Sequence, residues 1–179
     1  MQPPKDFFRP LALGAPMPVR EVPARPSRMI HFFDPSNEKM AAKVPDIAKK
    51  ADVVLGNLED AISADKKEAA REGLVSIAQA TDFGETQLWT RINSLDSPWC
   101  LPDLIRLVPA IGHKLDVIMV PKVEGAEDIH YIDRLLAQLE AQAGLERPIL
   151  VHALLETARG VANVEEICGA SPRMQGLSL

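Results

Sequence analysis

Short apolar runs recur along the chain at intervals of roughly 30 residues, and segments with a mixed polar and apolar pattern separate them. Several of the runs are almost continuously hydrophobic, which is typical of strands that are covered on both faces. The pattern predicts six strands, at residues 29–33, 52–58, 87–92, 117–122, 149–156 and 174–179.

The intervening segments repeat apolar residues with the period of an amphipathic helix. The clearest apolar face holds Ile129, Ile132, Leu135, Leu136, Leu139 and Ala143. Asp65, with Glu68 three residues later, resembles a capping box, and Ser97–Pro98 resembles a cap followed by proline at the first helical position. Gly144 stands where the longest helix is expected to end.

This alternation of strands and helices predicts a parallel α/β fold. We expect a parallel (β/α)8 TIM barrel, of which residues 29–179 contain the first six strands in sequence order, with the chain truncated before strands seven and eight. An open doubly wound sheet is the alternative. The first strand-to-helix turn, Phe33-Asp34-Pro35-Ser36-Asn37, argues against a Rossmann type because it lacks the glycine pattern of a dinucleotide site.

Residues 1–28 differ from the rest of the chain because they lack periodicity and are rich in proline and arginine. We expect an extended arm with little core of its own. Two forms of this arm remain open at this point. It is either a disordered tail or a segment that wraps a neighbouring subunit.

Composition narrows the class of protein. The chain has 179 residues, 46% of them hydrophobic, which is enough for one sizeable core. Its formal net charge is −5 and no basic stripe marks a nucleic-acid surface. No apolar run approaches the ~20 residues of a membrane span, and the N-terminus has no signal-peptide pattern. Cys100 and Cys168 form no close pair, which argues against disulfides or zinc. We expect a cytoplasmic protein that binds neither nucleic acid nor a membrane.

Charged residues stand where the apolar runs finish, namely Glu59, Asp60, Arg91, Lys122 and Glu156. In a parallel barrel, catalytic groups lie at the carboxyl ends of the strands. Because side chains alternate along a strand, Glu59, Arg91 and Glu156 converge at one mouth if their faces point inward. Carboxylate oxygens favour a hard divalent cation, with Mg²⁺ first and Mn²⁺ second.

Histidines are not expected to carry the chemistry. His31, His113 and His130 show no metal-ligand spacing, so we predict structural roles for them. His152 shares a strand face with Glu156 and is placed to line the barrel. A core histidine with satisfied hydrogen bonds is its expected role, and a site histidine is the alternative.

At these strand ends the sequence resembles the citrate lyase β-subunit-like group of the HpcH/HpaI aldolase superfamily, and within it the malyl-CoA lyases. The resemblance runs from about residue 29 to the end of the chain. The segments that carry it, in order, are residues 53–62 with Asn57-Leu58-Glu59-Asp60, residues 67–71, Thr90-Arg91-Ile92-Asn93, residues 118–123 with Pro121-Lys122, Leu155-Glu156-Thr157, and residues 171–179.

The resemblance implies a role for each site residue. Glu156 would be the metal ligand, Arg91 would contact the thioester or enolate oxygen, and Glu59 and Asp60 would support the metal waters and Arg91. A second metal carboxylate would follow strand six, beyond residue 179. The predicted residues that bind substrate or coenzyme A are Phe33, Pro35, Ser36, Asn37, Arg91 and Lys122.

Two positions depart from the family pattern. Asn57 stands where members often have aspartate, which removes one carboxylate near the metal. The first turn reads Pro35-Ser36 where members usually have Pro-Gly, and this turn approaches the coenzyme A side. Both changes indicate a branch of the family rather than loss of function.

The reaction implied is a reversible, Mg²⁺-dependent Claisen-type cleavage of a 3-hydroxyacyl-CoA such as malyl-CoA. The products would be acetyl-CoA or propionyl-CoA and glyoxylate, so the partners are an acyl-CoA thioester and a 2-oxo acid. A homo-oligomer, trimer or hexamer, is expected. The alternatives are a malyl-CoA thioesterase, a citramalyl-CoA or citryl-CoA lyase of the same family, and a non-catalytic scaffold that binds CoA esters.

Overall fold

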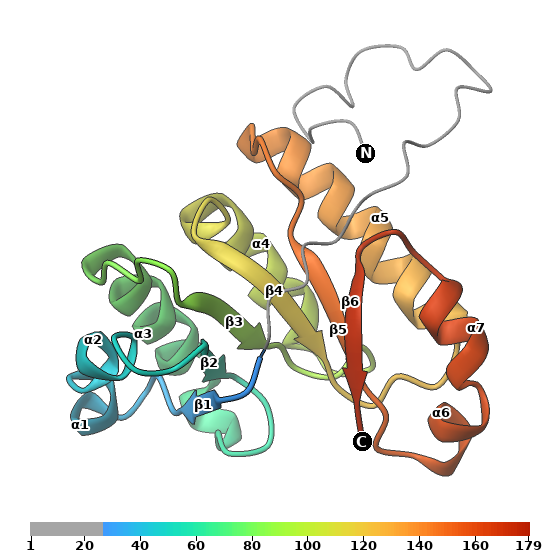
Figure 1. Cartoon of the computed structure of the whole chain (residues 1–179), viewed down its shortest axis with the longest axis horizontal. Coiled ribbons are helices and arrows are strands. Elements are labelled where there is room, and N and C mark those ends of the chain that lie inside the picture. Colours follow the sequence, from blue (N-terminus) through green and yellow to red (C-terminus); the bar gives the residue numbers. More distant parts are fainter. Residues whose placement is uncertain (1–26) are drawn as a thin grey trace.

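The computed structural model describes residues 27–179. Six strands alternate with helices along this part of the chain (Figure 1). The elements are β1 (Ile30–Phe33), α1 (Glu38–Ala41), α2 (Val44–Ile47), β2 (Val53–Asn57), the 3-10 helix η2 (Ala64–Lys66), α3 (Lys67–Ala80), β3 (Gln87–Arg91), α4 (Cys100–Ile111), β4 (Leu115–Val120), α5 (Ala126–Ala143), β5 (Leu150–Leu154), α6 (Ala158–Ala162), α7 (Val164–Gly169) and β6 (Met174–Ser178).

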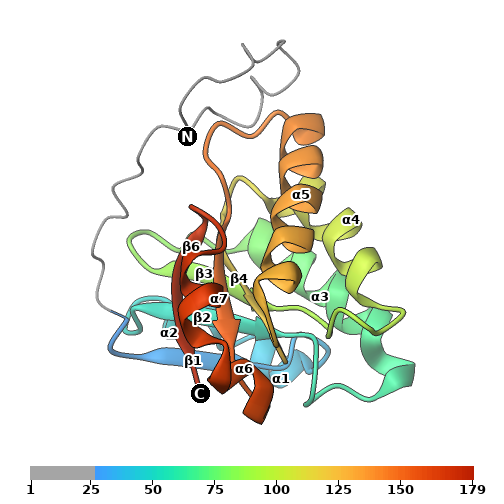
Figure 2. The same ribbon diagram turned by 90° about the vertical axis from the view of Figure 1, so that its right-hand side faces the viewer.

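The strands form one parallel sheet in the order β1-β2-β3-β4-β5-β6, with each strand beside its sequence neighbour. A doubly wound sheet would place β1 in the middle, so that alternative is wrong. Figures 1 and 2 show α3, α4 and α5 on the same side of the sheet. This sequential order, with helices outside, is the arrangement expected for the first six strands of a (β/α)8 barrel.

The two faces of the sheet have separate cores. The face toward the helices packs against α3, α4 and α5 in a large cluster that includes Val54, Leu88, Ile118 and Val151. The other face carries a smaller cluster, made by buried residues of the strands alone: Val53, Leu55, Trp89, Val117, Met119 and Leu150. Side chains alternate along each strand, so the second cluster is the inner face of the barrel wall.

Helix ends agree with the sequence prediction in one place and differ in two. Gly144 ends α5 in the left-handed conformation, with φ of 68°, as predicted. The prediction of a capping box is wrong, because Asp65 lies inside η2 and α3 begins at Lys67 without a side-chain cap. Helix α4 begins at Cys100, and Ser97 Oγ accepts a hydrogen bond from the Trp99 N–H at 3.4 Å instead of capping the helix.

Strands β4 and β5 end earlier than their apolar runs predicted, at Val120 and Leu154. Lys122 and Glu156 therefore lie in the loops that follow, where the backbone is free of sheet geometry. The predicted arm, residues 1–28, falls outside the described residues except for its last two. Of these, Arg28 donates hydrogen bonds to Asp52. Within residues 27–179, no helix is long and apolar enough to cross a membrane.

Arg173, just before β6, fixes that strand to the helix layer. It is 1% exposed and donates from Nη1 and Nη2 to the two carboxylate oxygens of Glu140 in α5, each at 2.6 Å. It also donates to Asp133 and to the Ile149 carbonyl oxygen. Burial raises the pKa of Glu140, although Arg173 opposes that shift. Neither ion can be removed alone without leaving a buried charge.

Arg173→Met in the full-length protein should therefore lower the free energy of unfolding by roughly 3–5 kcal/mol, measured by urea denaturation. Arg106→Met is the control. It breaks a pair with Glu72 that is about half exposed, and it should cost less than about 1 kcal/mol.

The double variant Arg173→Met, Glu140→Gln removes the stranded charge and should recover part of the loss, because the introduced amide oxygen could still accept the Ile149 N–H bond. A double variant less stable than Arg173→Met alone would contradict this account.

Candidate functional site

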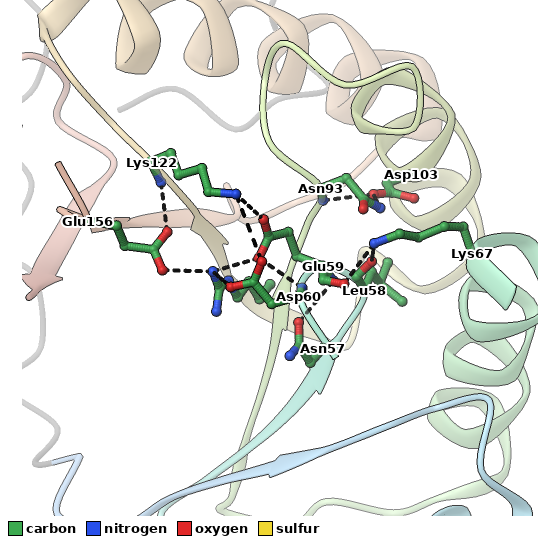
Figure 3. A network of polar contacts seen from close by, with 10 residues as sticks. Asn57, Leu58, Glu59, Asp60, Lys67, Asn93, Asp103, Lys122 and Glu156 are labelled. Atoms are coloured by element: carbon green, nitrogen blue, oxygen red, sulfur yellow. Dashed lines mark hydrogen bonds and ion pairs between the residues drawn. The ribbon is translucent and has the colours of Figure 1, made fainter. Parts of the chain in front are cut away.

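Five charged side chains from four strand ends meet at the carboxyl edge of the sheet (Figure 3). Glu59 and Asp60 follow β2, Arg91 closes β3, and Lys122 and Glu156 follow β4 and β5. Parallel strands in sequence order bring these loops to one edge. The predicted convergence of Glu59, Arg91 and Glu156 is confirmed.

Arg91 is the centre of this network. Its Nη2 lies 2.6 Å from Glu59 Oε2, 3.0 Å from Asp60 Oδ2 and 2.9 Å from Glu156 Oε1. Asp60 and Glu156 accept the hydrogen bonds from Nη2, and Glu59 is held as an ion pair. The Nε of Arg91 is buried and has no hydrogen-bond partner. An unsatisfied buried donor of this kind is unusual in a native protein.

Glu59 is fixed from several sides. It is 5% exposed, and its Oε1 accepts a hydrogen bond from Lys122 Nζ at 2.8 Å. Its Oε2 accepts from the Asp60 N–H, and its own N–H donates to Asn57 Oδ1 at 2.9 Å. The amide oxygen of Asn57 thus stabilises the turn after β2, a role that an aspartate at this position would also fill.

Asp60 lies on the solvent side of the network. A hydrogen bond with Glu59 and the positive charges of Arg91 and Lys122 hold its pKa below the usual value, against the opposing effect of burial. Three carboxylates therefore face the cationic side chains of Arg91 and Lys122, and the Lys67 ammonium adds a further positive charge beside them.

Lys122 has an unusual backbone. Its φ is 53°, in the left-handed region, and its N–H donates to Glu156 Oε2 at 3.2 Å. Its ammonium group donates to Glu59 and lies 3.8 Å from Asp60 Oδ1. The hydrogen bond to Glu59 is the largest cause of a raised pKa at Lys122.

Lys67 belongs to the site, and the sequence reasoning did not single it out. It is 7% exposed, and its Nζ donates to the carbonyl oxygens of Leu58 and Glu59 at 2.8 and 2.7 Å. The same ammonium lies 5.4 Å from the centre of the Trp99 ring, and burial lowers its pKa. Its signal in the sequence was its place at the start of residues 67–71, one of the segments that carry the family resemblance.

A cavity of about 330 Å³ lies on the Lys67 side of the turn that holds Glu59 and Asp60. Figure 3 shows Glu59 and Asp60 between Lys67 on one side and Lys122 and Glu156 on the other. The cavity wall combines both signs of charge with hydroxyl and aromatic groups: Glu59, Asp60, Ile62, Ala64, Lys67, Asn93, Ser94, Ser97, Trp99 and Lys122. Asn93 is held in place by two hydrogen bonds to buried Asp103 of α4.

Within residues 27–179, no hydrogen bond or ion pair joins the first turn to this network. Phe33 is 2% exposed and packs in the helix-side core, so its side chain does not face the inner surface. Ser36 Oγ donates to Asp34, and Asn37 caps α1 by accepting from the N–H groups of residues 39 and 40. Pro35 is buried, and a Cβ added at Gly73 of α3 would lie 2.2 Å from its carbonyl oxygen. The predicted contacts of these residues with coenzyme A stay predictions.

His152 lines the inner face, as its parity indicated. Its ring lies 5.2 Å from that of Trp89, centre to centre. Nδ1 is paired with Gln175 Oε1 at 2.9 Å and Nε2 with Ser178 Oγ at 2.8 Å. Burial lowers its pKa, and the hydrogen bond to Gln175 opposes the shift. Both ring nitrogens are satisfied, which fits the expected core histidine.

Glu156 fits a single position in the coordination shell of a hard cation. Its carboxylate is 27% exposed and each of its oxygens has lone-pair capacity beyond the bonds from Arg91 and Lys122. In the part of the chain that the structure describes, no group of three His, Cys, Asp or Glu side chains is arranged to hold a metal. Any remaining ligands would come from substrate, water or protein outside these residues.

Residues 28–179 match the sequence profile of the HpcH/HpaI aldolase/citrate lyase family. The chain belongs to this family. It is 59% identical over 174 residues to the malyl-CoA/beta-methylmalyl-CoA/citramalyl-CoA lyase of Chloroflexus aurantiacus, covering 97% of this chain and 50% of that protein. It is 40% identical over 162 residues to an L-malyl-CoA/beta-methylmalyl-CoA lyase of Cereibacter sphaeroides, covering 88% and 49%.

Solved structures of aldolase/citrate lyase family proteins share the fold. Protein CitE from Mycobacterium tuberculosis, in complex with magnesium, acetoacetate and coenzyme A, superposes with a TM-score of 0.61 at 28% identity, covering 83% of this chain and 46% of that one. The chain spans about half the length of the curated relatives it matches. The family and the fold of residues 27–179 are therefore shown, and the activity of the whole protein is a matter for proposal.

The lowered pKa of His152 predicts a pH-dependent stability. As pH falls below the ordinary histidine pKa of 6.5, the unfolded chain takes up a proton that the folded chain excludes. The stability contributed by this group is complete above pH 6.5 and is lost as pH falls toward the folded pKa, by up to about 1.4 kcal/mol per pH unit. Urea unfolding of the full-length protein between pH 8 and 5 should show a shallower decline in His152→Phe than in wild type. Equal slopes would contradict a buried, neutral His152.

Proposed function

We propose that the full-length protein is a Mg²⁺-dependent carbon–carbon lyase that cleaves a 3-hydroxyacyl-CoA such as malyl-CoA to acetyl-CoA, or propionyl-CoA, and glyoxylate. The observation that carries the proposal is Arg91: a guanidinium surrounded by three carboxylates, with a buried Nε that has no partner. The 59% identity to a protein named for cleaving such thioesters supports the choice of substrate.

Cleavage breaks the bond between the hydroxyl-bearing carbon and the carbon next to the thioester. The hydroxyl group loses its proton and becomes the glyoxylate carbonyl, and the departing thioester becomes an enolate that is then protonated to the acyl-CoA. The costly species is the enolate, because its negative charge has to be stabilised without bulk water. Arg91 supplies a fixed positive charge for its oxygen.

Rigidity of Arg91 is part of this role. Its side chain is 10% exposed, and carboxylates on either side limit its movement. A donor that is already oriented needs no reorganisation when charge develops. Glu59 and Asp60 act through Arg91 in this account, as residues that hold its guanidinium in place.

Glu156 is the residue that would hold Mg²⁺. When bound, Mg²⁺ supplies Lewis-acid chemistry at the 2-oxo acid carbonyl. Glu156 would then share its charge between the metal and Arg91. The magnesium in the structure of the Mycobacterium tuberculosis relative supports this choice of ion.

The function is tested with the purified full-length protein and malyl-CoA. We expect glyoxylate and acetyl-CoA to appear in equal amounts, with activity lost on chelation by EDTA and restored by Mg²⁺. Glyoxylate is measured as its phenylhydrazone and the thioesters by chromatography. Free CoA and malate without glyoxylate would instead indicate a thioesterase. Binding of acyl-CoA without turnover would indicate a non-catalytic scaffold.

The substrate range is tested in the same assay. The name of the Chloroflexus aurantiacus relative includes beta-methylmalyl-CoA and citramalyl-CoA. We therefore propose that this protein also accepts these two thioesters, which would yield propionyl-CoA with glyoxylate and acetyl-CoA with pyruvate respectively.

Two variants separate the metal ligand from the enolate donor. Glu156→Gln should weaken Mg²⁺ binding and abolish turnover, because a neutral amide is a poorer ligand for a hard cation. Arg91→Lys should keep Mg²⁺ binding and slow turnover by about 10²–10³, since lysine lacks the planar fork. Calorimetry gives the Mg²⁺ affinity and steady-state kinetics give kcat. Normal affinity and turnover in Glu156→Gln would refute its assignment.

A further inference from the structure

The loop after β4 contains a backbone conformation that stands apart from its surroundings. Among residues 27–179, Lys122 is the one non-glycine residue with a positive φ, 53°. L-amino acids rarely adopt this region, because the Cβ crowds the following carbonyl group. Such conformations persist where the surrounding structure holds them in place, and they concentrate at functional sites.

The surrounding contacts show how this conformation is held. The next residue, Val123, is fully buried, and its N–H donates to the Leu154 carbonyl oxygen at 3.2 Å. The Val123 carbonyl oxygen in turn lies against Gly160, where an added Cβ would approach to 2.2 Å. The chain after Lys122 is therefore fixed to β5 and α6, and the left-handed turn lies between this anchor and β4.

The turn directs two groups of one residue at two different carboxylates. The Lys122 N–H donates to Glu156 Oε2 at 3.2 Å, and the Lys122 Nζ donates to Glu59 Oε1 at 2.8 Å. Figure 3 shows Lys122 between these two side chains. Arg91 Nη2 contacts the other oxygen of each carboxylate, Oε1 of Glu156 and Oε2 of Glu59. Lys122 and Arg91 therefore hold the same two carboxylates, each through a different oxygen.

We propose that Lys122 is a positioning residue with two separable parts: its left-handed backbone orients Glu156 for the cation, and its ammonium group orients Glu59 and, through it, Arg91. The inference rests on the proposed function. It also gives Lys122 a different role from the contact with substrate or coenzyme A that the sequence suggested. The ammonium group already donates one of its three N–H groups to Glu59, and the kinetics below separate this role from a contact with a ligand.

The backbone part is tested by Mg²⁺ affinity, measured by calorimetry on the full-length protein without substrate. Lys122→Gly, Lys122→Met and Lys122→Val all remove the ammonium group. Glycine adopts positive φ freely, methionine keeps the strain of the native lysine, and β-branched valine resists the conformation most strongly. The glycine and methionine variants should therefore bind Mg²⁺ within about twofold of each other. The valine variant should bind about tenfold more weakly, the usual effect of losing a group that orients a metal ligand. Equal affinity in the glycine and valine variants would overturn the backbone part.

The side-chain part is tested by steady-state kinetics with malyl-CoA. Lys122→Met should lower kcat about tenfold or more with KM changed less than about twofold, and Lys122→Arg should recover much of kcat. A residue that binds coenzyme A would give the opposite division, with KM raised and kcat kept. That result would overturn the positioning role.

Lys114→Met is the matched control. Lys114 lies next to the other end of β4, where its Nζ donates to the carbonyl oxygens of Ala78, Gln79 and Thr81. Its loss should lower stability and leave both Mg²⁺ affinity and kcat unchanged. A wild-type protein that binds Mg²⁺ but cleaves no acyl-CoA would refute the proposed function and with it the side-chain part, while the order of Mg²⁺ affinities would still decide the backbone part. A wild-type protein that does not bind Mg²⁺ would overturn both.

Discussion

Three carboxylates can share one small region of this protein because the guanidinium of Arg91 lies among them. Like charges a few ångströms apart repel strongly where water is scarce, and a buried carboxylate without a partner would take up a proton rather than stay ionised. A guanidinium is a permanent cation in proteins. At the centre of the network it offsets the repulsion among the three carboxylates.

The sheet makes this arrangement possible without long-range adjustment. Each charged group follows or ends a different strand, and neighbouring strands in a parallel sheet lie about 4.8 Å apart. Arg91 on β3 can thus contact groups that follow β2 and, through its long side chain, Glu156 after β5. The two apolar clusters, one on each face of the sheet, have different roles. The helix-side cluster holds the strands in the wall, and the inner cluster below the site excludes water from beneath Arg91.

Sequence patterns predicted the parts of this structure that follow from periodicity. The two sheet faces follow from alternation along the strands, and the meeting of Glu59, Arg91 and Glu156 follows because successive parallel strands bring their carboxyl ends to one edge. The same parity applied to β1 places Ile30 on the inner face and Phe33 on the helix side, which is where the structure has them. Expecting Phe33 near the ligand rested on its neighbourhood in the sequence rather than on the face it occupies.

Other features depend on contacts between distant segments, and a single sequence does not encode them in any local pattern. Lys67 reaches back to the turn after β2, so the start of α3 is set by a tertiary contact and the expected capping box is not formed. In the sequence, Arg173 is one more charged residue before an apolar run. Only the folded structure shows that its guanidinium pairs with both carboxylate oxygens of Glu140. The sequence likewise gives no sign of the left-handed backbone at Lys122, because the residue is neither glycine nor asparagine, the types that favour this conformation.

The close approach of Gly73 to Pro35 has a mechanical consequence. Helix α3 touches the turn after β1 at Gly73, and at its first residue, Lys67, it is bonded to the turn after β2. The turns after β1 and β2 therefore share one support, and it lies behind the sheet in the helix layer rather than at the open edge where the charged groups meet.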